Sequence, residues 1–250
     1  MKIVLSPTKT MMNSQFKIED SPSSIPFFQK EAINIHQLLK GFSKQKLKTL
    51  MKLSENLYTQ TINDIQLWDS EKFYKTPAVF AYQGTSFKYL EPQKWKLSDA
   101  NYAQNHLLII SGLYGVLRPF DWINKYRLEM GLKFEIESSK SLIQFWKDKM
   151  TNYFNSFQED NLIINLASKE YSNVIINKSI NSTIIDCAFY EKSNNSLKVV
   201  GSYSKAARGS MANFIVKNKL ESIEELEGFM ELGYNFSSDD SSNNKLVFVR

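Results

Sequence analysis

The 250-residue sequence has few of the side chains that build disulfides and metal centres, with one cysteine, Cys187, and two histidines, His36 and His106. A single cysteine excludes an internal disulfide. Two histidines and one cysteine are too few for a conventional zinc or iron–sulfur site, and no E-x-x-H pair of the di-iron type occurs. We therefore expect no metal and no other cofactor. Cys187 lies in an apolar stretch, which favours a small buried residue over a nucleophile.

Long hydrophobic runs are also missing, because no apolar stretch reaches the length of a membrane span. No charged and apolar leader opens the chain, so we expect a cytoplasmic protein without a membrane partner. The motifs G-x-x-x-x-G-K-[ST], G-x-G-x-x-G, G-x-S-x-G and H-E-x-x-H are absent. Their absence argues against the common nucleotide-binding, dinucleotide-binding, hydrolase and zinc-protease designs.

Arginine is scarce: the 31 basic residues are 27 lysines and only four arginines. Where lysine supplies nearly every positive charge, an arginine indicates a need for its planar fork, which grips phosphate or carboxylate bidentately. Two arginines and three of the nine glycines fall within Ser111–Gly131, directly after the apolar run His106–Ile110. The net charge of +5 permits attraction to anions but is weak support for nucleic acid, since the lysine richness extends over the whole chain.

The composition predicts one mixed α/β domain over residues 1–250, with a central sheet surrounded by helices. An apolar content of 42% and an aromatic content of 13% are enough for a full core. No repeat and no long linker divides the chain. The patterns predict strands at 2–5, 78–82, 107–111, 162–166, 183–190 and 197–203 and a C-terminal pair within 233–250, and helices beginning near Phe28 and Ser43 and over 141–157, 205–220 and 222–228.

Polar and charged residues follow several of the predicted strands, in segments 6–10, 111–131, 165–171 and 204–209. If these strands are parallel in one sheet, their carboxyl ends bring the segments into one crevice. Five cations would then face two carboxylates across a basic pocket. The cations are Lys9, Arg118, Arg127, Lys205 and Arg208, and the carboxylates are Glu129 and Glu170.

Structural roles compete with binding at several of these positions. Arg118 and Arg127 are equally suited to internal ion pairs with Asp121 or Glu129. Ser168 fits a helix N-cap as well as a catalytic group, and Glu170 is then favoured in the first helical turn. The stripe of Lys44, Lys48 and Lys52 is more typical of a solvated helix face than of a phosphate track. Arg208, expected near the start of a helix, opposes the helix dipole there, which indicates a bound anion or a carboxylate partner.

The glycines of the sequence Gly112-Leu113-Tyr114-Gly115 are spaced as in the hairpin of helix-hairpin-helix modules, where backbone N–H groups meet DNA phosphates. Two glycines at this spacing are also common in unrelated turns. We include Gly112 and Gly115 among the candidate DNA contacts on this pattern.

Taken together, the segments closely resemble the YaaA family of bacterial peroxide-stress proteins. Five family patterns occur in the same order in this sequence. They are L-I-S-P-A-K-T at Val4–Thr10, S-G-L-Y-G-V-L-R-P-x-D with Y-R-L-E-M-G at Ser111–Gly131, N-L-A-S-x-E-Y at Asn165–Tyr171, K-x-A-R-G at Lys205–Gly209, and a closing G-Y-x-F with L-V-F-x-R at Gly233–Arg250. The resemblance covers essentially the whole chain. The sequence departs from the pattern at Asn124-Lys125, where family members often have a proline, and this leaves the loop before Tyr126 open.

The resemblance implies a compact α/β domain of a fold described as cantaloupe-like, with a basic cleft and a helix-hairpin-helix element that binds DNA. It also implies a cytoplasmic protein that limits peroxide damage by keeping free intracellular iron low. The expected partner is DNA, as a regular or distorted duplex, together with a possible small anionic ligand. The alternative is an enzyme acting on a nucleobase or a small phosphate- or carboxylate-bearing metabolite in the same cleft. The candidate catalytic residues are then Glu129, Glu170 and Ser168, although the resemblance brings no settled catalytic residues and we lean against an enzyme. Direct iron binding is a third possibility that the scarcity of histidine and cysteine disfavours.

Overall fold

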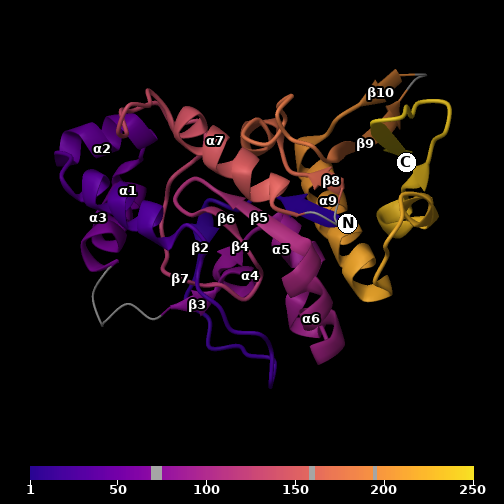
Figure 1. Cartoon of the computed structure of the whole chain (residues 1–250), viewed down its shortest axis with the longest axis horizontal. Coiled ribbons are helices and arrows are strands. Elements are labelled where there is room, and N and C mark those ends of the chain that lie inside the picture. The colour runs from indigo at the N-terminus through magenta and orange to yellow at the C-terminus, as the bar shows by residue number, and fades with distance from the viewer. Residues whose placement is uncertain (69–74, 158–160, 194–195) are drawn as a thin grey trace.

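A mixed β-sheet forms the centre of the computed structural model, which describes residues 1–68, 75–157, 161–193 and 196–250. Its strands are β1 (Lys2–Leu5), β5 (Leu107–Ser111), β6 (Gly115–Leu117), β8 (Leu162–Leu166), β9 (Thr183–Ser193), β10 (Ser196–Lys198), β11 (Asn235–Phe236) and β12 (Lys245–Val249). Their order across the sheet is β11-β12-β9-β8-β1-β5-β6, and β10 pairs with β9 off this path (Figure 1). A single sheet thus joins the two ends of the described chain.

The inner strands are parallel. β1 lies between β8 and β5, with Ile3 level with both Ile164 and Leu107. β9 and β12 continue the parallel arrangement beyond β8. All five residues of β5 are buried, as expected for parallel strands covered on both faces. The carboxyl ends of β1, β5 and β8 therefore lie along one edge of the sheet.

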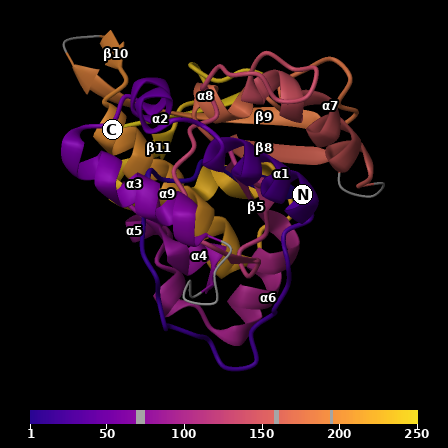
Figure 2. The ribbon, with the colours of Figure 1, turned by 90° about the vertical axis from the view of Figure 1, so that its left-hand side faces the viewer.

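Helices cover both faces of this sheet. The longer ones are α1 (Gln29–Lys40), α2 (Lys44–Met51), α3 (Glu55–Leu67), α6 (Leu97–His106), α7 (Leu142–Asn155) and α9 (Gly201–Asn218), and the shorter ones are α4 (Ala78–Ala81), α5 (Thr85–Leu90) and α8 (Lys169–Ser172). Figure 2 shows α7 on one side of β8 and β9, and α5, α6 and α9 on the other. Within the described residues, no helix is long and apolar enough to cross a membrane.

Short elements complete the fold. Two small antiparallel pairs, β2 (Thr10–Met11) with β4 (Tyr82–Gln83) and β3 (Thr76–Pro77) with β7 (Trp122–Ile123), lie outside the central sheet. Three 3-10 turns are η1 (Pro92–Lys94), η2 (Glu224–Gly228) and η3 (Glu231–Gly233). The pairing of β2 with β4 holds the segment after β1 against the start of α5, and this contact shapes the cavity described below.

The predicted class, a mixed α/β protein with a central sheet, is confirmed, and so are most of its elements. Two helix N-caps form: Ser43 accepts the Lys46 N–H, and Ser141 accepts the Gln144 N–H at the start of α7. The helix predicted over 222–228 is the 3-10 turn Glu224–Gly228, whose Glu225 accepts the Ser222 N–H at 2.9 Å. The predicted C-terminal strands are present as the antiparallel pair of β11 and β12.

Three of the predicted elements are wrong. The run Ala78–Tyr82 is mainly the short helix α4, because a brief buried apolar run does not distinguish a helix from a strand. The helix predicted from Ser43 is two helices, separated at Lys52, whose φ of 50° ends α2 in the left-handed region. The strand predicted over 197–203 is only β10 at its beginning, and α9 starts at Gly201.

Candidate functional site

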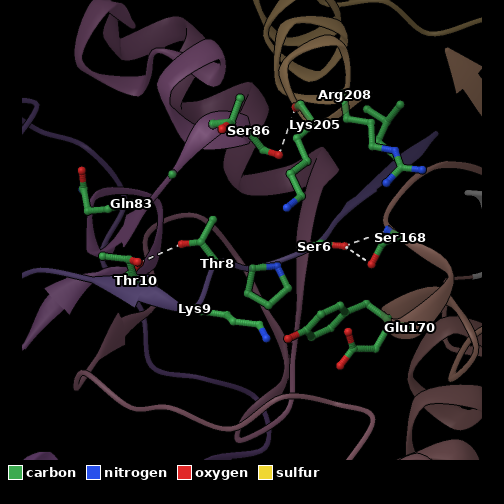
Figure 3. Close-up of a pocket in the computed structure, with 15 residues that line it drawn as sticks. Ser6, Thr8, Lys9, Thr10, Gln83, Ser86, Ser168, Glu170, Lys205 and Arg208 are labelled. Carbon is green, nitrogen blue, oxygen red and sulfur yellow. Dashed lines mark hydrogen bonds between the residues drawn. The ribbon is translucent and has the colours of Figure 1, made fainter. Parts of the chain in front are cut away.

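A cavity of about 360 Å³ opens at the carboxyl ends of β1 and β8. Its walls come from the segments after these two strands, from the start of α5 and from α9, as Figure 3 shows. The polar lining residues include Ser6, Thr8, Lys9, Ser86, Ser168, Glu170, Lys205 and Arg208. Parallel strand ends are the common location of ligand sites in α/β proteins, and three of the four predicted segments meet at this cavity.

Two serines from neighbouring strand ends hold one wall together. Ser6 Oγ accepts the backbone N–H of Ser168 at 2.8 Å and donates to Ser168 Oγ at 3.3 Å. Ser168 does occupy the N-cap position of α8, but its side chain makes no capping hydrogen bond. Its hydroxyl faces Ser6 and the cavity instead, so the structure supports the N-cap prediction in position only.

Helix α9 contributes both Lys205 and Arg208, one turn apart. Lys205 is exposed and Arg208 is half-buried, and both side chains extend from α9 toward the cavity (Figure 3). No described residue pairs with either cation, and the Arg208 Nε is buried without a hydrogen-bond partner there. Burial lowers the pKa of Arg208, against the opposing influence of Cys187 and Asp186. Arg208 also lines a second cavity of about 580 Å³, which lies beside Asp186 and Cys187.

The dipole argument for Arg208 is wrong, although the residue does face the predicted pocket. α9 begins at Gly201, so Arg208 is its eighth residue and lies well inside the helix. The dipole acts mainly over the terminal turns and does not explain a cation at this position. The feature that calls for an anion is instead the missing partner of its buried Nε.

Lys9 belongs to an ion cluster behind the cavity. Glu129 Oε1 lies 3.2 Å from Lys9 Nζ and 3.2 Å from Arg127 Nη2. The Glu129 side chain is 11% exposed and that of Arg127 17%, whereas Lys9 is largely open to solvent. Glu129 therefore neutralises Arg127 and positions the Lys9 ammonium at the cavity. Of the two structural roles considered for Arg127, the pairing with Glu129 is the one that forms.

Glu170 is a cavity wall residue that also braces the same cluster. Its Oε1 accepts the Gly131 N–H at 3.1 Å, which ties the end of the 111–131 segment to the turn after β8. Tyr171, its neighbour, is 8% exposed and lines the cavity as well. Burial, together with the nearby Tyr126, Glu170 and Glu129, raises the pKa of the Tyr171 hydroxyl.

Arg118 does not join the pocket. β6 is antiparallel to β5, with Ser111 level with Gly115 and Ile109 level with Leu117. The chain has therefore turned back before it reaches Arg118, which lies toward the opposite edge of the sheet. There Arg118 Nη2 contacts Asp121 Oδ1 at 3.3 Å, the other structural role that the sequence allowed. The prediction that all five cations share one pocket failed at Arg118, because it assumed parallel strands throughout, and also at Arg127, which does not line this cavity.

Gly112 and Gly115 lie in the tight connection between β5 and β6, a β-hairpin and not a hairpin between two helices. Both are buried. A Cβ at Gly112 would lie 2.2 Å from the Leu128 carbonyl oxygen, and Gly115, with φ of 66°, lies under the Trp146 ring. These contacts give the two glycines a packing role, and we place no DNA contact on them.

Cys187 is buried, as predicted, and burial raises the pKa of its thiol to about 12. The thiol is protonated at neutral pH, and a protonated thiol is a poor nucleophile. The polar lining residues that lie outside every predicted segment are Gln83, Thr85 and Ser86, whereas Thr8, Thr10 and Tyr171 lie within predicted segments but were not named as site residues. Gln83–Ser86 directly follow the predicted strand 78–82, so the strand-end signal used for the other segments could have found them; this short segment carries no charged side chain and was not selected.

Gly209 allows α9 to approach α5 closely. A Cβ at Gly209 would lie 2.0 Å from the Ser86 carbonyl oxygen, and Ser86 Oγ donates to the Lys205 carbonyl oxygen at 3.0 Å. The glycine of the K-x-A-R-G pattern thus sets the distance between α9 and the α5 side of the cavity. Lys205 and Arg208 depend on this contact for their position.

Replacing Gly209 by Ala is expected to destabilise the protein by about 1–3 kcal/mol, because the backbone of Ser86 must move to admit the methyl group. The melting temperature should fall by roughly 2–12 °C in a calorimetric scan. Gly201→Ala is the matched control in the same helix, since nothing lies within 4 Å of a Cβ there. Equal melting temperatures for the two variants would show that α9 and α5 are not in close contact.

The fold and the site together define an α/β protein with a polar, cation-lined cavity at the carboxyl edge of its parallel strands. Residues 1–240 match the family described as peroxide stress protein YaaA, and the chain belongs to this family. It is 38% identical to UPF0246 proteins of Legionella pneumophila, strain Lens, and of Agathobacter rectalis, over 100% of this chain and 99% of each relative. A UPF0246 protein of Crocosphaera subtropica is 36% identical over the full length of both chains. Family membership confirms the resemblance and supports a role in peroxide stress.

Proposed function

We propose that this protein acts in peroxide stress as a cytoplasmic DNA-binding protein, whose basic cleft of Lys9, Lys205 and Arg208 contacts backbone phosphates. The observation that carries the proposal is the pair of cations on α9 that no described residue neutralises. Unpaired lysine and arginine beside a polar cavity attract phosphate, and DNA supplies a high density of phosphates. Bound protein would limit oxidative damage to the DNA that it covers.

The proposal includes an indirect effect on free intracellular iron. With two histidines and one cysteine in the chain, a conventional iron site has too few ligands. Equilibrium dialysis with ferrous iron is therefore expected to show no tight stoichiometric binding. A tight stoichiometric complex with ferrous iron would contradict the indirect effect and would mean that the protein sequesters iron directly.

The salt dependence of duplex DNA binding tests the role of the cleft. The logarithm of the binding constant falls with the logarithm of salt concentration, by about 0.9 for each phosphate that a cation neutralises. Lys205→Ala and Arg208→Ala should each reduce that slope by roughly one. Fluorescence anisotropy over a series of salt concentrations measures it.

Arg118→Ala is the comparison variant, because Arg118 lies toward the other edge of the sheet and is paired with Asp121. Its slope should equal that of the unchanged protein. If Arg118→Ala flattens the slope and the two α9 variants do not, the DNA surface lies elsewhere and the cleft assignment is wrong.

A second candidate function is an enzyme acting on a small phosphate- or carboxylate-bearing metabolite. The small volume of the cavity favours it, because Ser168 and Glu170 share with the α9 cations a space far smaller than a duplex. Acid–base groups and anion-binding groups in one pocket suit such chemistry. A panel of phosphorylated metabolites that leaves the melting temperature unchanged would count against it.

A further inference from the structure

Arg208 is the exception among the four arginines. Each of the others has a carboxylate partner: Arg118 with Asp121, Arg127 with Glu129 and Arg250 with Glu191. No carboxylate among the described residues lies within ion-pair distance of Arg208, although its Nε is fully covered by protein. Leaving a buried charge unpaired is costly, and a guanidinium fork matches phosphate oxygens in pairs. An anion beside Arg208 would remove that cost.

The Ser168 hydroxyl adds a donor at the same end of the cavity. Ser168 Oγ accepts from Ser6 Oγ, and Ser6 Oγ in turn accepts the Ser168 N–H. Within the described chain the Ser168 hydroxyl hydrogen has no acceptor, so it is available to a ligand. Figure 3 shows Ser168 below Arg208, with Lys205 extending from the same helix into the space beside them. Three donors of two kinds thus surround one position.

The other end of the cavity has different chemistry. Glu170 and Lys9 lie there, away from Arg208 (Figure 3). Glu170 accepts one backbone N–H from Gly131 and, as a carboxylate with two oxygens, retains acceptor capacity for a ligand N–H or O–H. Pro7, Leu166 and Tyr171 add apolar surface to the cavity lining. The cavity therefore offers hydrogen-bond donors for a phosphate at one end, an acceptor at the other and apolar surface in its wall.

The cavity size limits the occupant. About 360 Å³ is near the lower end of the range of roughly 300–1,000 Å³ that small-molecule sites occupy. A duplex does not enter such a space, whereas a single nucleotide carries the matching groups, with phosphate at one end and N–H or O–H donors on its base and sugar.

We propose that the cavity binds one nucleotide, with its phosphate held by Lys205, Arg208 and the Ser168 hydroxyl and its base or sugar donors against Glu170. The proposal rests on the proposed function and specifies the occupant of the same site. The nucleotide has two possible sources, a free nucleoside monophosphate or an unpaired nucleotide turned out of a DNA strand, since extrusion costs least where a base is already unpaired.

The test compares the two sources with the same variants. Isothermal titration calorimetry measures the binding of the four common nucleoside monophosphates and of the matching nucleosides. Fluorescence anisotropy measures the binding of a regular DNA duplex and of the same duplex with a one-nucleotide bulge. For a free source, at least one monophosphate binds, its nucleoside binds roughly tenfold more weakly or worse, and Arg208→Gln lowers monophosphate affinity by a similar factor. For a DNA source, the bulged duplex binds more tightly than the regular one, and Arg208→Gln removes that preference.

Lys94→Ala is the control, because Lys94 is paired with Glu91 and does not line the cavity. It should change neither measurement. Ser168→Ala is a second test variant that keeps every charge and should weaken binding of the same ligand by a smaller factor.

If no monophosphate binds and the bulged and regular duplexes bind equally, the inference fails. The proposed function fails separately, if the regular duplex binds without the salt slope that the α9 cations contribute.

Discussion

Replacing Glu129 by Ala should lower the free energy of unfolding by about 3–5 kcal/mol. Glu129 is the only carboxylate within ion-pair distance of Arg127 among the residues that the structure places. Because the Arg127 side chain is 17% exposed, the substitution leaves a mostly buried guanidinium unpaired. The melting temperature should fall by roughly 6–20 °C, measured by calorimetry.

A double substitution separates the ion pair from the loss of packing. Arg127→Met with Glu129→Ala removes both charges, so the protein should recover a large part of the stability that the single substitution loses. Glu91→Ala is the exposed control, since its pair with Lys94 is open to solvent and should contribute about 0–1 kcal/mol. A Glu129→Ala protein as stable as the Glu91→Ala protein would mean that Arg127 finds water or another partner without cost.

Glu129→Ala has a functional consequence as well, because Glu129 also contacts Lys9. Without that contact the exposed Lys9 side chain loses its fixed position at the cavity. Because Lys9 and Arg127 both lose their counter-charge, DNA binding should strengthen and its salt slope should steepen. Weaker binding with an unchanged slope would instead mean that Glu129 acts mainly by fixing the position of Lys9.

Replacing Trp146 by Ala should destabilise the protein by about 3–5 kcal/mol, as for other fully buried large aromatic side chains. Trp146 is fully buried on α7, and its Nε1–H donates to the Gly112 carbonyl oxygen at 2.9 Å. Its ring lies over Gly115, whose added Cβ would lie 2.7 Å from a ring carbon. The substitution therefore opens a cavity under the β5–β6 connection and also leaves a buried carbonyl without its donor.

Two further tryptophan variants separate the contributions of the Trp146 ring and of its hydrogen bond to stability. Trp146→Phe keeps an aromatic ring but removes the Nε1–H, so it should cost less than Trp146→Ala and still more than about 1 kcal/mol. Trp122→Ala is the matched control, because Trp122 is only half-buried and donates to the exposed Ser23 hydroxyl. Denaturant unfolding gives all three values. An equal loss for Trp146→Ala and Trp122→Ala would show that α7 does not anchor the connection.

These two predictions give most residues of the 111–131 segment a structural role in packing and ion pairing. Its two leading glycines pack against Leu128 and Trp146, and Arg118 and Arg127 pair with carboxylates. Of the described cations that line the cavity, the two without an ion-pair partner, Lys205 and Arg208, come from α9 instead. A scarce residue in a distinctive pattern thus indicated an ion pair as readily as a binding site, because arginine suits both.

The sequence by itself determined the class of fold and most of the buried strands, since these depend on local periodicity. It also determined that Ser6, Ser168 and Glu170 follow strands, which suffices when neighbouring strands are parallel. Only the tertiary structure decided where Arg118 and Arg208 lie. The direction of β6 and the start of α9 depend on pairing with distant segments, and no local pattern contains that information.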